Sequence, residues 1–104
     1  MSKLFSPYEL KGKTIKNRLV MAPMCMYSAE NGLANDWHLT HYLTRAVGGV
    51  GTIVVEATGV LPEGRITEQD LGLWDDSQIA PLKRIVEEVR KYDCLIGIQL
   101  NHAG

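Results

Sequence analysis

Sulfur and phenol groups follow one another in the stretch from Asn17 to Ser28, where a short apolar run ends at Pro23. Aliphatic runs stopped by proline are typical of a buried strand leaving its sheet, and active groups concentrate on the loops that follow. Cys25 could there modulate an electron-accepting ring, with the phenol of Tyr27 two positions away. Methionine-rich apolar runs also serve core packing, so that alternative stays open at this point.

Two further apolar runs end in small or polar residues that could join the same site. In parallel α/β structures the carboxyl ends of the strands face one side, where ligands bind. A side-chain amide such as Gln99 can pair with the donors and acceptors of a planar heterocycle, and a small residue such as Ala57 leaves room for a flat ring. The residues expected to converge are Cys25, Tyr27, Ala57, Gln99 and His102.

Several other polar residues have simpler interpretations. Glu56 could act as a base, but a hydrogen-bonded structural carboxylate is favoured. His38 and His41 are three apart on a predicted helix, yet without a nearby third ligand we expect structural hydrogen bonds and predict no metal site. The glycines of 48–51 follow a helix and precede a strand, which indicates helix termination and not a nucleotide loop. Cys94 is expected to be a buried, inert thiol.

The elements that must position these groups alternate between strand and helix. The sequence predicts a β-hairpin around residues 11–13, strands at 20–23, 52–56 and 95–100, and helices at about 35–47 and 78–92. Alternation of this kind implies parallel βαβ units, and the apolar runs are typical of strands covered on both faces. About three parallel strands cannot close a (β/α)8 barrel, which takes about 250 residues. We therefore expect residues 1–104 to be the incomplete N-terminal portion of one such domain.

Composition excludes several classes of function. The net charge of −1 gives no basis for a nucleic-acid partner or an anionic membrane surface. No apolar segment approaches the roughly 20 residues that span a bilayer. Two cysteines do not make a disulfide framework, so reduced thiols and a cytoplasmic location are expected.

The chain as a whole resembles a known family, the Old Yellow Enzyme flavin-dependent ene-reductases, and more closely their thermophilic-like class. The segments that carry the resemblance occur in the family's order along the chain. They are 4–7 (LFSP), 16–18 (KNR), 22–27 (APMCMY), 38–42 (HLTHY), 55–57 (VEA), 64–66 (GRI) and 99–104 (QLNHAG). The resemblance implies a TIM barrel that is closed at its N-terminal end by the hairpin and carries FMN at the other end.

The resemblance also implies roles for individual residues. Ala22, Pro23, Met24 and Cys25 would line the flavin, with Cys25 near the reactive ring and tuning its potential. Ala57 and Gln99 would contact the isoalloxazine, and Tyr27 would help to position the substrate. The family's substrate-binding histidine pair and phosphate-binding loops have no counterpart among these residues. No catalytic residue is therefore assigned within the chain.

The implied activity is reduction of an activated alkene, such as an α,β-unsaturated carbonyl, by NADPH or NADH through FMN. We expect a small-molecule substrate, a homo-oligomer for the full-length protein, and no activity for these 104 residues alone. Two alternatives remain: a related barrel reductase that acts on a dienoyl thioester, and a non-enzymatic half-barrel fragment.

Overall fold

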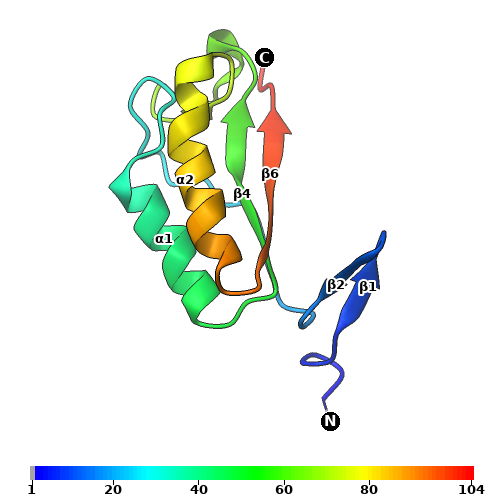
Figure 1. The fold of residues 1–104 in the computed structure, drawn as a ribbon. Helices are drawn as coiled ribbons and strands as arrows, with labels where there is room; N and C mark the ends of the chain where they lie inside the picture. Colours follow the sequence, from blue (N-terminus) through cyan, green and yellow to red (C-terminus); the bar gives the residue numbers. More distant parts are fainter. Residues whose placement is uncertain (1) are drawn as a thin grey trace.

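A computed structural model describes residues 2–104, in which strands and helices alternate as predicted (Figure 1). The strands are β1 (Tyr8–Leu10), β2 (Lys13–Ile15), β3 (Val20–Met21), β4 (Thr52–Gly59), β5 (Leu71–Gly72) and β6 (Leu95–Asn101). The helices are α1 (Asp36–Val47) and α2 (Ile79–Arg90), with single 3-10 turns η1 (Pro62–Gly64) and η2 (Asp76–Gln78).

The central strand of the parallel sheet is β4. Along one edge it pairs first with β3 and then, near its carboxyl end, with β5, a strand too short for the sequence to predict. Along the other edge it pairs with β6. Helices α1 and α2 lie together on one face of the sheet, which gives the predicted βαβ arrangement (Figure 1).

Helix α1 begins and ends where the sequence predicts. The side chain of Asn35 accepts a hydrogen bond from the Trp37 backbone, and the side chain of His38 accepts one from the Asn35 backbone, which forms a capping box. The helix is followed by glycines, of which Gly49 takes a φ of 106° that favours a residue without Cβ.

Helix α2 is shorter than predicted. Asp75 caps the turn η2 through the Ser77 backbone, and the α-helix starts only after Gln78. The Gln78 amide explains the delay, because its oxygen accepts hydrogen bonds from the backbones of Trp74 and Asp75 and holds the chain in a tight turn. At the other end the chain leaves the helix after Arg90.

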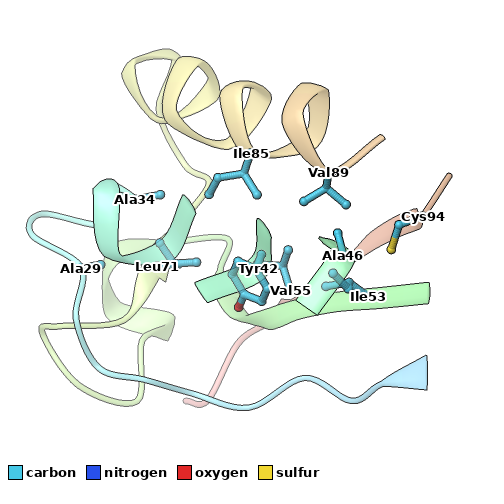
Figure 2. Close-up of a cluster of buried hydrophobic side chains, with 10 residues drawn as sticks. All are labelled: Ala29, Ala34, Tyr42, Ala46, Ile53, Val55, Leu71, Ile85, Val89 and Cys94. Carbon is cyan, nitrogen blue, oxygen red and sulfur yellow. The ribbon is translucent and has the colours of Figure 1, made fainter. Parts of the chain in front are cut away.

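The core lies between the helices and the sheet. Ile85 and Val89 of α2 point toward Tyr42 and Ala46 of α1 and toward β4 (Figure 2). Cys94 is buried at the edge of this cluster, as predicted. The buried members are Ala29, Ala34, Tyr42, Ala46, Ile53, Val55, Leu71, Ile85, Val89 and Cys94.

The predicted hairpin forms from β1 and β2 and lies near the N-terminal ends of β4 and β6, away from the helices (Figure 1). Its position is fixed in part by Lys16, whose Nζ donates to the carbonyl of Tyr92 at 2.7 Å. Asn17 adds a second tie, because its amide donates to the Gly49 carbonyl at 2.8 Å.

The prediction that all three long apolar runs are covered on both faces is wrong for two of them. Strand β4 is largely buried, but Val20 of β3 is 61% exposed and Leu100 of β6 is 60% exposed. The reason is topological, because β6 pairs only with β4 among the described residues and the helices cover one face of the sheet. The strand predicted at 20–23 is also reduced to the two residues of β3.

Candidate active site

The carboxyl half of β4 contains an irregularity opposite Gln99. Val55 pairs with Ile98, whereas the next pair joins Thr58 to Leu100. Two residues of β4, Glu56 and Ala57, therefore face the single residue Gln99. Such bulges redirect side chains and are common beside active sites.

The bulge brings together two of the predicted flavin contacts. Ala57 is 6% exposed, so its methyl group adds little bulk beside the strand end. Gln99 is exposed, and its amide makes no hydrogen bond to any of residues 2–104. A free amide next to a small residue suits the polar edge of a planar heterocycle, which offers both donors and acceptors.

The loop after β3 supplies the other predicted residues. Met26 packs against the core, and its sulfur lies 3.3 Å from the indole nitrogen of Trp37 on α1. Met24, in contrast, is 55% exposed. The core-packing interpretation of the methionine-rich run therefore holds for Met26 and fails for Met24. Ala22 is exposed as well, and Pro23 is half-buried.

Cys25 and Tyr27 are direct neighbours on this loop. The charge of Cys25 raises the pKa of the Tyr27 hydroxyl, with smaller contributions from burial and from a hydrogen bond between the two side chains. Tyr27 has a φ of 52°, which is uncommon for a residue with a Cβ and turns the chain so that both side chains share one side. Both remain accessible, since Cys25 is half-buried and Tyr27 is 47% exposed.

A buried pair, Tyr42 and Glu56, connects this loop to β4. The Tyr42 hydroxyl donates to the Glu56 carboxylate at 3.1 Å and accepts the Glu56 backbone N–H at 3.0 Å. Burial raises the pKa of Glu56, while hydrogen bonds from Tyr42 and from the Met26 backbone lower it. The predicted structural carboxylate is confirmed, but the sequence analysis missed Tyr42. Its place on the inward face of α1, one turn after His38, was the available signal.

His102 lies near the same end of the sheet but docks elsewhere. Its ring covers Gly64 of η1, where an added Cβ would lie 2.8 Å from the ring. The carbonyl of Gly64 also accepts a hydrogen bond from the Ala103 backbone at 2.8 Å. His102 thus holds the loop after β6 against the loop after β4. Arg65, the next residue of that loop, donates to the carbonyls of Pro62 and Glu68.

The most apolar groove lies away from these residues. It is a hollow of about 340 Å³ between α2 and β6, on the helix side of the sheet. Its lining is almost entirely aliphatic and carries no group suited to chemistry. The predicted site is instead an open surface at the carboxyl ends of β4 and β6. Within residues 2–104 there is no cluster of three metal-ligating side chains, and no helix of that part is long and apolar enough to cross a bilayer.

Comparison with known families decides the relationship. The model of the NADH:flavin oxidoreductase / NADH oxidase family matches residues 3–104. The chain belongs to this family. An oxidoreductase assignment follows, and the resemblance to Old Yellow Enzyme is confirmed.

Similar proteins agree with the family assignment. The NADPH dehydrogenase of Listeria monocytogenes serotype 4a is 57% identical over 106 residues, which cover 100% of this chain and 31% of that protein. Morphinone reductase in complex with tetrahydroNAD superposes with a TM-score of 0.91 at 32% identity, covering 100% of this chain and 28% of that one. Old Yellow Enzyme from Pichia sp. AKU4542 has a TM-score of 0.89 at 32% identity, covering 96% and 26%.

These matches place the fold as well. The chain spans less than a third of the length of the relatives that it matches. Its parallel strands, with α1 and α2 on one face, correspond to part of a TIM barrel, and the antiparallel hairpin precedes them. The predicted fold class is therefore confirmed, and the family's cofactors are FMN and a reduced nicotinamide.

Proposed function

We propose that this chain forms part of an FMN-dependent ene-reductase that reduces activated alkenes, such as α,β-unsaturated carbonyls, with NADPH. The observation that carries the proposal is the pairing of Gln99 with the bulge at Ala57, at the carboxyl end of a family-matched sheet. The printed names of similar proteins, NADPH dehydrogenase and morphinone reductase, support both the reductant and the reductive chemistry.

The residues present fit a flavin in chemistry and in space. Gln99 offers an unpaired amide to the pyrimidine edge of the ring system, and Ala57 leaves room beside it. Cys25 presents a polarisable thiol from the loop, and Tyr27 presents a phenol to the substrate. Ala22, Pro23 and Met24 are proposed to complete this wall.

When bound, FMN would accept hydride from the nicotinamide and deliver it to the alkene, so the redox chemistry belongs to the cofactor. The chain's own residues bind and orient. Gln99 fixes the ring by hydrogen bonds, Cys25 adjusts the electrostatic environment of its reactive part, and Tyr27 orients the substrate. The positions of these groups are held by β6, by the bulge of β4 and by the loop after β3.

The proposal is tested in a whole barrel. The test protein is a chimera, in which this chain replaces the matching segment of the Listeria monocytogenes NADPH dehydrogenase. We expect stoichiometric FMN and NADPH-driven reduction of cyclohexenone under anaerobic conditions. A folded chimera that binds FMN but reduces no alkene would refute the assigned substrate class.

We further infer that the 104 residues alone do not turn over substrate. One face of β6 is open, with Leu100 60% exposed, and an unpaired strand edge associates with other chains. The helix N-termini and loops that would bind the FMN phosphate in a complete barrel are expected beyond the matched portion. Steady turnover by a monomeric preparation of this chain would overturn that inference.

A further inference from the structure

The loop that carries Cys25 and Tyr27 is attached to the rest of the protein at one residue. Within 22–27, Met26 alone among the described residues is hydrogen-bonded to another secondary-structure element. Its sulfur accepts from the Trp37 indole on α1, and its backbone is bonded to the Glu56 carboxylate on β4. The placement of the two neighbouring side chains therefore depends on how firmly Met26 is held.

Glu56 is itself held in a single orientation. Tyr42 donates to one carboxylate oxygen at 3.1 Å and at the same time accepts the Glu56 backbone N–H at 3.0 Å. Both side chains are 1% exposed, so water cannot replace either hydrogen bond. The carboxylate is thus locked to its own backbone through Tyr42.

We propose that Tyr42 and Glu56 are positioning residues for the active site, a buried pair that fixes the Met26 peptide and so sets the places of Cys25 and Tyr27. This inference rests on the proposed function for its catalytic meaning, but the geometric effect on Cys25 does not require flavin. The pair acts through Met26 and touches neither substrate nor cofactor.

A purely structural role explains the carboxylate poorly. A buried carboxylate opposes folding unless it is well paired, and an apolar residue of similar size commonly serves a core better. The neighbouring charge of Asp70 makes this environment still less favourable for Glu56, and so does burial itself. A carboxylate does provide what the loop needs, because its two oxygens accept from two donors at once. One donor is Tyr42 and the other is the Met26 backbone.

The decisive variants in the chimera are Glu56→Gln and Tyr42→Phe. An amide has one acceptor oxygen in place of two, so Glu56→Gln can satisfy only one of the two donors. Tyr42→Phe removes one hydroxyl at nearly constant volume and leaves the carboxylate free to turn. Tyr92→Phe is the matched control, because the Tyr92 side chain is 43% exposed and makes no hydrogen bond within residues 2–104.

The readout is the rate at which Cys25 is alkylated in the FMN-free chimera, well below the melting temperature. The rate that disappears in Cys25→Ser is assigned to Cys25. We expect both pair variants to raise it at least fivefold, to speed hydrogen exchange at the Met26 amide, and to shift the flavin absorbance of the loaded protein. Tyr92→Phe should leave all three unchanged.

The outcomes separate the two proposals. A lower melting temperature with unchanged alkylation, exchange and flavin absorbance would show that the pair only stabilises the fold, and would overturn the inference. If a variant does not fold, the other variant decides by the same measurements. If the parent chimera binds no FMN, the proposed function fails, while the alkylation and exchange rates still test the positioning role.

Discussion

The imidazole Nδ1 of His38 accepts a hydrogen bond from the backbone N–H of Asn35 at 3.1 Å. His38 is fully buried, and its Nε2 has no partner among residues 2–104. A nitrogen that accepts from a backbone N–H must be unprotonated, so the ring is neutral and its second nitrogen carries the hydrogen. The capping box of α1 therefore requires a neutral His38.

This geometry predicts a pH-dependent stability. Burial, with a smaller contribution from His41, lowers the pKa of His38 below its usual value of 6.5. As the pH falls below 6.5, the unfolded chain takes up a proton that the folded chain does not, so the free energy of unfolding decreases. We expect His38→Gln to remove this loss when denaturant unfolding of the chimera is followed between pH 8 and about pH 5.

The control is His102→Gln, since His102 is exposed. Its unfolding free energy should keep the pH dependence of the parent protein. Parallel pH curves for the parent and His38→Gln would show that His38 is protonated equally in the folded and unfolded states.

Gly32→Ala should destabilise the fold. Gly32 has a φ of 75°, and an added Cβ would lie 2.5 Å from the Gln78 amide nitrogen and 2.7 Å from the Trp74 ring. Strain and overpacking together are expected to lower the free energy of unfolding by about 1–3 kcal/mol. Gly97→Ala is the control, because a Cβ there meets nothing within 4 Å. Equal melting temperatures for the two variants would contradict the prediction.

Cys25→Ala should shift the FMN reduction potential of the chimera and change turnover moderately. The thiol neighbours Tyr27, and no histidine adjacent in sequence activates it as a nucleophile. Spectroelectrochemical titration measures the potential. Cys94→Ala is the control, since Cys94 is buried at the far end of β6. Complete loss of turnover with an unchanged potential would instead assign Cys25 an obligatory chemical role.

The features that sequence predicted are those that short segments determine. The cap at Asn35, the glycines after α1 and the turn between β1 and β2 all depend on neighbouring residues, and all form. The features that it missed are long-range. The bulge depends on the register of β4 against β6, and the hydrogen bonds of Glu56 come from a residue 14 positions away. The two-residue strand β5 exists only because β4 continues far enough to pair with it.

Convergence of the site residues was predictable because parallel strand ends share one side of a sheet, but the way they are held was not. Nothing in the sequence shows that Met26 packs inward while Met24 faces solvent. That difference arises from the turn at Tyr27 and from the contact of Met26 with Trp37. Both depend on the position of α1 relative to the loop.

The most direct test of the flavin surface is Gln99→Leu. The Gln99 amide is exposed and makes no hydrogen bond within residues 2–104, so its polar groups are available to a bound ring. Leucine is similar in size but leaves the facing donor and acceptor unpaired, at about 1–3 kcal/mol per buried group. FMN titration of the chimera should therefore show at least about fivefold weaker binding. Gln69→Leu, an exposed glutamine outside the site, should bind FMN as the parent does. If both variants retain the parent's affinity, Gln99 does not contact the flavin, and the bulge opposite it serves the packing of β4 against β6 alone.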